Sequence, residues 1–380
     1  MKVGIVGASA SGIYTALFLS RAKPDAEIVL FDRMDKPGKK LLATGNGHCN
    51  LFHTPLSPSA YNQPGFVESL LKRYDEKALL DGLRSLGVAT FNKGELVYPL
   101  SYSASAYLSY LLSLCEKARI SFRLEEKVIG VNENELKTNK GEYHFDHIVF
   151  AFGGCSQANL GSDGSLFPLL SSIGYRVNAP RPVLCPLKSP DVPKSLFGVR
   201  HTAKLFLKRK GKTVYEEEGE VLFKKDGLSG IAVMNASSFA RPDDIVRLDL
   251  FPHLSLPELT MMIAASASSL KQGYLSAILE RPLAEYIEKR IGICDKKDEK
   301  CEKIAALLKC LEFKVSGLYG FDSSQVSRGG IDLNEVDENL RSKRYPNHWF
   351  VGECLDVDGL CGGYNLGFAL LSAMVVGNAL

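Results

Sequence analysis

The stretch Lys2 to Arg21, KVGIVGASASGIYTALFLSR, decides the fold that we expect for this chain. The apolar run Val3 to Val6 predicts a strand, and the residues after the turn have the spacing of a helix. The turn reads Gly7-x-Ser9-x-x-Gly12, with Ser9 where a dinucleotide-binding turn usually has its second glycine. Such a turn needs small residues where the backbone bends, where N–H groups approach a pyrophosphate and where helix and strand pack closely. The pattern therefore predicts the start of a dinucleotide-binding fold.

A second apolar run, Glu27 to Phe31, ends on Asp32 and completes a strand-helix-strand unit of about 30 residues. An acid at this position accepts hydrogen bonds from the ribose of an adenosine. A strand-helix-strand unit that binds no nucleotide would give a similar pattern, and this alternative stays open.

The composition limits the kinds of protein that the chain can be. Its 380 residues exceed the roughly 250 to 300 at which one core stops growing, so we expect two or three modules. A net charge of +3, with Lys and Arg spread along the chain, favours no nucleic-acid partner. The nine cysteines form no C-x-x-C pair and show no zinc spacing, which favours reduced thiols without a metal. No apolar run has the length of a membrane span. We therefore expect a cytoplasmic protein with no membrane partner.

A glycine-rich loop, Pro37 to Asn50 (PGKKLLATGNGHCN), follows the second strand. Its glycines permit backbone geometries closed to other residues, and Lys39 and Lys40 could face an anion. The loop resembles the G-R/K-K-x-x-x-S/T-G-x-G-R-C-N signature of a bacterial FAD-binding family that includes aminoacetone oxidase and BaiN-type reductases. His48 stands in the place of the arginine, which exchanges a permanent fork of donors for a group that titrates near neutrality.

The end of the chain carries the longest resemblance to this family. Residues 353–365, ECLDVDGLCGGYN, continue as the family's E-x-L-D-V-D-G-x-x-G-G-Y-N, after a strand-like segment WFVG. Residues 151–154 (AFGG) resemble its A-T-G-G turn, and residues 327–331 (SRGGI) resemble its T-x-G-G-V segment. Residues 161–164 (GSDG) precede a further predicted helix. The free N–H groups of this helix start could bind an anion, or Ser162 could simply cap the helix.

The resemblance implies noncovalent FAD held between the N- and C-terminal motifs. In flavoproteins of this type the main chain of a valine, here Val128, meets the adenine, and the acid corresponding to Glu353 reaches the ribityl-pyrophosphate region. The cofactor residues that it implies are Gly7, Ser9, Ala10, Ser11, Gly12, Asp32, Arg33, Lys39, Lys40, Leu41, Thr44, Asn46, Gly47, Cys49, Asn50, Val128, Ala151, Gly153, Asp163, Gly352, Glu353, Asp356, Gly363, Tyr364, Asn365 and Leu366.

The predicted fold class is α/β, a Rossmann-like FAD-binding domain of the two-dinucleotide-binding flavoprotein type with an inserted β module and an inserted helical module. We expect the FAD-binding domain at 1–180 and 322–380, the β-rich insertion at 181–254 and the helical insertion at 255–321. Alternation of polar and apolar residues from 203 to 223 predicts antiparallel strands, and helical spacing dominates from 256 to 311. Helices are expected at 66–86, 104–118 and 366–380, and strands at 126–131 and 143–150.

The function that we expect is an FAD-dependent oxidoreductase whose small organic substrate enters under the inserted modules. The resemblance permits amine oxidation by oxygen or reduction with NAD(P)H as electron donor. A non-catalytic flavin-dependent binding protein, an RNA-associated protein and a nicotinamide dehydrogenase are the alternatives. No catalytic residue is assigned; the candidates are His48, Asn46 and Tyr364, with Asn365 beside them, and each could instead shape or hydrogen-bond the flavin.

Overall fold

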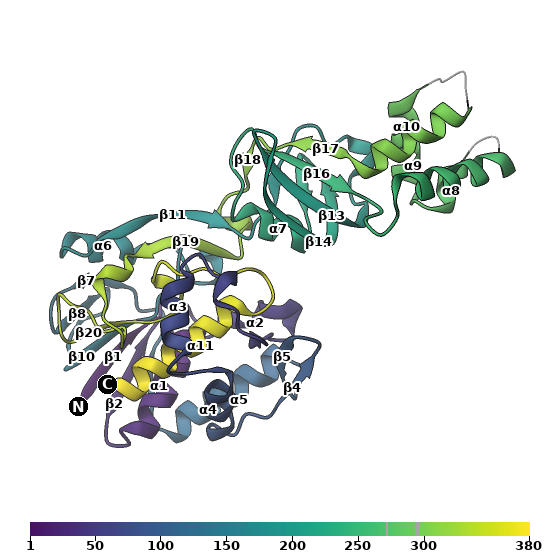
Figure 1. The fold of residues 1–380 in the computed structure, drawn as a ribbon. Coiled ribbons are helices and arrows are strands. Elements are labelled where there is room, and N and C mark those ends of the chain that lie inside the picture. The colour runs from purple at the N-terminus through teal and green to yellow at the C-terminus, as the bar shows by residue number, and fades with distance from the viewer. Residues whose placement is uncertain (271–272, 293–296) are drawn as a thin grey trace. The chain divides into compact units, whose positions relative to one another are not determined.

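The computed structural model describes residues 1–270, 273–292 and 297–380, and these form two compact units. The first unit contains Met1–Pro182 and Gln325–Leu380, and the second contains Val183–Ser324 (Figure 1). The first unit is thus built from both ends of the chain. The predicted boundaries at 180, 254 and 322 stay predictions.

The first unit contains a parallel sheet of five described strands in the order β20-β10-β1-β2-β6. Its strands are β1 (Lys2–Val6), β2 (Glu27–Phe31), β6 (Ser121–Arg123), β10 (His147–Phe150) and β20 (His348–Phe350). The chain leaves β1 toward β2 on one side and later returns to β10 on the other, so the strand order reverses at β1. Ligands of doubly wound sheets bind at the carboxyl edge beside such a point. The predicted Rossmann-like fold class is confirmed.

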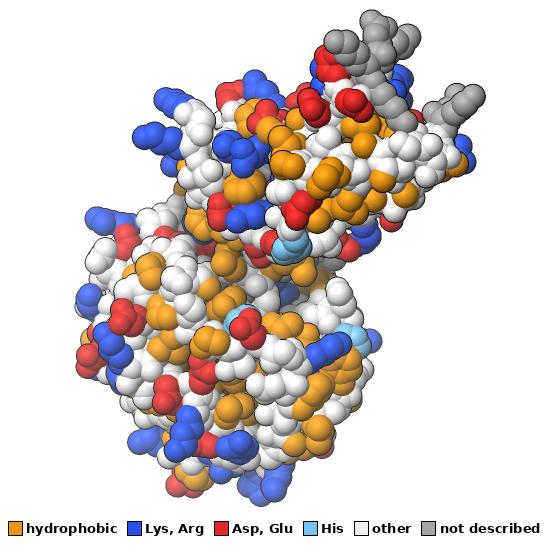
Figure 2. Space-filling model, turned by 45° about the vertical axis from the view of Figure 1, so that its right-hand side comes forward, with side chains coloured by type: hydrophobic (Ala, Val, Ile, Leu, Met, Phe, Trp, Pro, Cys, Tyr) orange, Lys and Arg blue, Asp and Glu red, His pale blue; other side chains and the backbone are white. Residues whose placement is uncertain are grey.

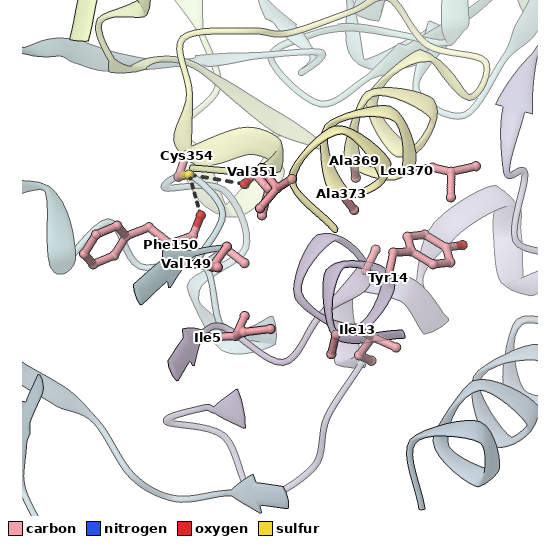
Figure 3. Close-up of a cluster of buried hydrophobic side chains, with 14 of the residues drawn as sticks. Ile5, Ile13, Tyr14, Val149, Phe150, Val351, Cys354, Ala369, Leu370 and Ala373 are labelled. Carbon is pink, nitrogen blue, oxygen red and sulfur yellow. Dashed lines mark hydrogen bonds between the residues drawn. The ribbon is translucent and has the colours of Figure 1, made fainter. Parts of the chain in front are cut away.

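The helices α1 (Ala10–Ala22) and α11 (Tyr364–Ala379) pack against each other on this sheet, and α5 (Ala104–Lys117) contacts α1. An ideal Cβ on Gly377 would lie 2.6 Å from the Cβ of Phe18 in α1. Figure 3 shows Ala369 and Ala373 on the side of α11 that faces α1. Small residues here serve close helix packing.

Three sequence-based expectations for the first unit need correction. The helical stretch 66–86 is two helices, α3 (Pro64–Leu71) and α4 (Glu76–Ser85), because Asp75 caps α4 by accepting a hydrogen bond from the N–H of Ala78. The predicted strand 143–150 is divided between β9 (Glu142–His144), which pairs with β8 (Glu135–Thr138), and β10 of the parallel sheet.

The third correction concerns the helix expected after residue 164. It is α6 (Leu166–Ser172), whose N-cap residue is Ser165 without a side-chain capping hydrogen bond. Ser162 is therefore not its cap. The remaining elements of this unit are α2 (Lys39–Leu42), β3 (Phe52–His53), β4 (Thr90–Lys93), β5 (Leu96–Pro99), β7 (Val128–Val131), β11 (Val177–Val183) and β19 (Val326–Ile331).

The second unit holds an antiparallel sheet with the order β17-β16-β13-β14-β15-β12-β18 among its described residues. Apolar residues of the long strands and of the helices share one core, which includes Leu205, Phe223, Leu259 and Ile304. The alternation of polar and apolar residues from 203 to 223 therefore correctly predicted antiparallel strands. The elements are β12 (Leu187–Lys188), β13 (Arg200–Arg209), β14 (Lys212–Lys224), β15 (Gly227–Ser229), α7 (Ile231–Ser237), β16 (Ile245–Asp249), α8 (Leu256–Ser269), α9 (Arg281–Ile291), α10 (Lys297–Lys309), β17 (Leu311–Lys314) and β18 (Gly317–Leu318).

Basic and acidic side chains are intermixed on the face drawn in Figure 2. Within the described ranges, no helix is both long enough and apolar enough to cross a membrane. The eight cysteines that the structure describes form no disulfide with one another, and Cys294 lies outside those ranges. Among the same residues, no group of His, Cys, Asp or Glu could hold a metal ion.

Candidate functional site

The turn between β1 and α1 lies at the carboxyl edge of the sheet and is closed by two glycines. Gly7 has a φ of +114°, and a Cβ there would lie 2.3 Å from the carbonyl oxygen of Ala151 at the end of β10. A Cβ on Gly12 would lie 1.9 Å from the carbonyl oxygen of Gly7. Only glycine fits either place, so the turn and β10 can approach closely, as the turn pattern predicts.

The N-terminus of α1 has no side-chain cap, because Ser9 is the N-cap residue and makes no capping hydrogen bond. The first turn also carries no acidic residue. Its N–H groups and its partial positive charge are therefore left for an anion. A Cβ on Gly352, which follows β20, would lie 2.8 Å from Oγ of Ser11, so the turn after β20 lies against this helix start.

Asp32 is fixed at the end of β2 by two backbone donors. Its Oδ2 accepts from the N–H of Ala8 and its Oδ1 accepts from the N–H of Met34, both at 2.9 Å. Burial raises the pKa of Asp32, and these two N–H groups only partly oppose that shift. A carboxylate offers about four acceptor positions, so further donors can still bind to Asp32.

Arg33 and Asp163 fasten a loop beside Asp32. The guanidinium donates to the carbonyl of Ala158 and, over 3.0 Å, to that of Gly161, and it pairs with Asp163 at 3.3 Å. Burial raises the pKa of Asp163, but the Ser165 N–H and hydroxyl and the nearby cations outweigh it and leave the pKa below its usual value. One of these cations is Lys127, at 3.8 Å, the residue that precedes Val128 in β7.

Lys40 and Glu353 join the glycine-rich loop to the C-terminal motif. The ammonium of Lys40 donates to Oε2 of Glu353 at 2.6 Å, and Oε1 accepts from the N–H and the hydroxyl of Ser327 at 2.9 and 3.2 Å. A Cβ on Gly154 would lie 1.9 Å from Oγ of Ser327, so a larger residue there would displace the Ser327 and Glu353 side chains. Lys39 instead pairs with the exposed Asp35 at 2.5 Å.

Several other predicted cofactor residues are packed into the core of the first unit. Leu41 and Cys49 are buried, and burial raises the pKa of the Cys49 thiol to about 12. A thiol that stays protonated is a packing group and a poor nucleophile. Thr44 donates its hydroxyl to the carbonyl of Leu41 at 2.6 Å. Val128, Ala151 and Leu366 are likewise buried in this core.

The second half of the glycine-rich loop meets the N-terminus of α11. Gly45 and Asn46 have left-handed backbones, and Asn50 is buried. A Cβ on Gly363, the N-cap residue of α11, would lie 2.9 Å from Oδ1 of Asn50. Oδ1 of Asn50 is buried without a hydrogen-bond partner among the described residues, and α11 has no side-chain cap. Unsatisfied donors and an unsatisfied acceptor thus converge at one place.

Tyr364 and Asn365 begin α11, but their side chains are engaged in different ways. The amide of Asn365 accepts from the N–H of Gly359 at 2.9 Å and donates to its carbonyl at 2.8 Å, which closes the preceding turn. The ring of Tyr364 stacks on His53 with centroids 4.7 Å apart. Burial, then Glu95 and Glu76, raise the pKa of Tyr364. Asn365 is therefore a structural amide, and Tyr364 faces the β3–β5 strands.

The acids of the D-V-D segment bind donors that the sequence did not indicate. Asp356 accepts from the amide of Asn62 at 3.1 Å and from that of Asn178 at 2.9 Å. Asp358 accepts two hydrogen bonds from Arg328, at 2.7 and 2.8 Å. Burial of two carboxylates requires such partners. The partners of Asp356 lie 178 and 294 residues away along the chain, and Arg328 lies 30 residues from Asp358, so none of them gives a local signal.

These groups together have the features that a dinucleotide cofactor requires. Two uncapped helix N-termini and an acid after the second strand lie in the same unit, and glycines stand where a Cβ would collide. The buried, unpartnered Oδ1 of Asn50 adds a polar atom that a ligand can satisfy. The residues present therefore fit FAD.

Comparisons with known proteins agree with this geometry. The family model described as "HI0933-like protein Rossmann domain" matches residues 1–379. A 3-dehydro-bile acid delta(4,6)-reductase of Clostridium scindens is 28% identical over 402 residues, covering 100% of this chain and 98% of that protein. A ribosomal RNA dihydrouridine synthase of Escherichia coli is 28% identical over 386 residues, covering 97% and 95%. A 3-ketosteroid delta1-dehydrogenase from Sterolibacterium denitrificans shares the fold, with a TM-score of 0.52 at 10% identity over 99% and 98% of the two chains. The chain belongs to the HI0933-like family of FAD-dependent oxidoreductases.

Proposed function

We propose that the protein is an FAD-dependent reductase that saturates a carbon-carbon double bond conjugated to a carbonyl group. The observation that carries this proposal is that two relatives matched over nearly their whole length are named for one kind of reaction on different compounds. A 3-dehydro-bile acid with Δ4 and Δ6 double bonds and a uridine both contain such a conjugated bond. The shared chemistry, and not either compound, is what we transfer to this chain.

The residues described above would hold FAD in a defined way. The first turn of α1 would bind the pyrophosphate, and Asp32 would accept from the ribose. The N-terminus of α11, with Asn50 beside it, would take the polar edge of the flavin ring. When bound, FAD carries two electrons from a donor to the substrate. The chain's own residues bind it, orient it and place polar groups beside it.

The electron donor that we propose is NADH or NADPH. A reductase needs an external source of hydride, and a nicotinamide nucleotide is the usual one. Within the described residues, the parallel sheet of the first unit contains one glycine-rich strand-turn-helix, β1 to α1. The donor would therefore visit the FAD site in turn with the substrate, without a separate nucleotide domain of its own.

Two kinds of substrate that contain such a conjugated bond, a small carbonyl compound and an RNA, are compared in the test. The intermixed charges on the face in Figure 2 favour a small carbonyl compound over a nucleic acid. Our expectation of no nucleic-acid partner is nevertheless not retained, because two relatives are named for ribosomal RNA.

The test is anaerobic flavin spectroscopy. The purified protein should carry FAD that denaturation releases, and NADH or NADPH should bleach it. The reduced protein is then mixed with a 3-oxo-4,6-diene bile acid or with unmodified ribosomal RNA, and reoxidation by either one supports a reductase. Bleaching by aminoacetone, with reoxidation by oxygen alone, would make the protein an amine oxidase. Flavin that no donor reduces would leave a binding protein.

A further inference from the structure

The imidazole of His48 is held in one orientation by Tyr102. The two rings are stacked with centroids 3.9 Å apart and planes 7° apart. Nδ1 of His48 lies 2.9 Å from the carbonyl oxygen of Tyr102. Because a carbonyl oxygen can only accept, Nδ1 carries a proton in both charge states of the ring. The neutral ring is therefore the Nδ1–H tautomer, with its lone pair on Nε2.

Nε2 of His48 has no hydrogen-bond partner in the described part of the chain, and it is not among the buried unpartnered atoms there. Lys93 is a charged neighbour of the stack: its ammonium donates to the Tyr102 hydroxyl at 3.1 Å and lies 5.3 Å from the centroid of the Tyr102 ring. Tyr98 meets Tyr102 edge-on at 5.0 Å. The lysines of α2, which contacts this loop, are engaged by Asp35 and Glu353. Nε2 is thus accessible and is not committed to a structural contact.

The backbone on both sides of the stack is strained. Tyr102 has a φ of +48°, a conformation that a bulky residue rarely adopts. In the glycine-rich loop, Asn46 and Cys49 have φ values of +52° and +59°. Strain of this kind persists where the surrounding structure fixes it, and it is frequent at functional sites. The same loop ends at Asn50, whose side chain lies against Gly363 at the start of α11.

We propose that His48 is the proton donor of the reaction and that Tyr102 is the residue that positions it. The inference rests on the proposed reductase function. In the reduction, a hydride originating from the nicotinamide nucleotide forms a C–H bond at one carbon of the double bond. The Nε2–H bond of protonated His48 breaks, and its proton forms the C–H bond at the neighbouring carbon. The imidazole is left neutral and regains a proton from water.

Two substitutions of His48 test the roles of its two ring nitrogens separately. His48→Asn places an amide nitrogen near Nδ1, where it can still donate to Tyr102, and leaves nothing at Nε2. His48→Gln reaches the place of Nε2 with an amide that does not titrate. Both variants should keep FAD and should be reduced by NADPH within about threefold of the wild-type rate. Reoxidation by whichever probe serves the wild type, the diene bile acid or the ribosomal RNA, should fall at least a hundredfold, the range of general acid catalysis.

A second readout does not depend on turnover. Nitrogen-15 NMR of the FAD-loaded protein should show His48 Nδ1 protonated at every pH measured, with Nε2 as the bare nitrogen of the neutral ring. Tyr102→Phe keeps the ring and the carbonyl and should leave this pattern unchanged, whereas Tyr102→Leu, which removes the stack, should mix the two tautomers.

Reoxidation at the wild-type rate in His48→Asn, or a protonated Nε2 with a bare Nδ1, would overturn the assignment. Failure of NADPH and NADH to reduce the wild type would instead overturn the reductase function, while the NMR result would still report the fixed tautomer.

Discussion

Replacing Arg328 by Met should cost the first unit about 3 to 5 kcal/mol of unfolding free energy, the usual cost of removing one partner of a buried ion pair. The two nitrogens of Arg328 donate to Asp358 at 2.7 and 2.8 Å, and the Asp358 side chain is 1% exposed. Burial raises the pKa of Asp358 even with Arg328 beside it. Without this guanidinium, the buried carboxylate would lose both of these charge-assisted hydrogen bonds and would keep only the weaker electrostatic influence of Arg181. Since domains are stable by about 5 to 15 kcal/mol, the loss would be a large fraction of the total.

The single tryptophan, Trp349, lies in β20 and is buried, so its fluorescence reports unfolding of the first unit in urea. Arg176→Met is the matched control, because Arg176 is 70% exposed and lies 3.7 Å from Asp332. We expect that variant to stay within about 0.5 kcal/mol of the wild type.

The pH dependence of Arg328→Met gives a second check. A carboxyl whose folded pKa is raised destabilises the fold only at pH values above its unfolded pKa, and fully only above its folded pKa. The gap between Arg328→Met and wild type should therefore narrow as the pH falls from 8 to 5. A loss below 1 kcal/mol, or a gap that does not change with pH, would refute the view that Asp358 is buried as a charged group dependent on Arg328.

Three further results are expected. Lys40→Met should weaken FAD binding roughly ten- to hundredfold, because it removes a charge-assisted hydrogen bond to Glu353. Lys39→Met, the control, should change FAD affinity less than threefold. Equal effects of the two substitutions in FAD titrations of the apoprotein would refute a specific role for the Lys40–Glu353 pair. Asp32→Ala should weaken FAD binding by a similar factor, and an unchanged Kd would mean that another residue reads the ribose. His348 is buried and its pKa is lowered to about 4, so below the unfolded pKa near 6.5 the unfolded chain binds the proton more strongly than the folded protein does. Urea unfolding should therefore show the wild type losing about 2 kcal/mol of stability relative to His348→Gln between pH 7 and pH 5. Parallel stability curves for the two proteins would contradict this.

Local signals predicted the first strand-helix-strand unit well. The expected strand Glu27 to Phe31 coincides with β2, because a short apolar run ending on an acid has few other solutions. The run from 143 to 150 shows where such signals end. Tyr143 pairs with Leu136 in one sheet and Ile148 pairs with Gly4 in another. No glycine or proline separates the two segments, so only their pairing partners distinguish them. One partner is the neighbouring strand β8, and the other is β1 at the start of the chain.

The same limit applies to the candidate site. The positions of Gly7 and Gly12 were predictable because each glycine is demanded by a close backbone approach within a short turn. Asn62 was not, because an asparagine in a loop has no distinguishing pattern until its partner is known. The segment 327–331 was singled out, but the contact of Ser327 with Glu353 was not predicted. The signal that existed was indirect. Two acids in the D-V-D segment, if buried, require donors, but this requirement does not say which residues supply them.

The candidate site is built from residues that are far apart in the sequence. Lys40 depends on Glu353 for its counter-charge, and the Asn50 side chain lies where only a glycine at 363 leaves room for it. The left-handed backbone of the loop that contains Asn46 is therefore supported by the last strand and helix of the chain. The uncapped N-termini of α1 and α11 come from opposite ends of the chain, so neither end alone provides both of them. A cofactor that binds only after both ends have met must stabilise their union by mass action, so FAD affinity and the stability of the first unit are coupled quantities.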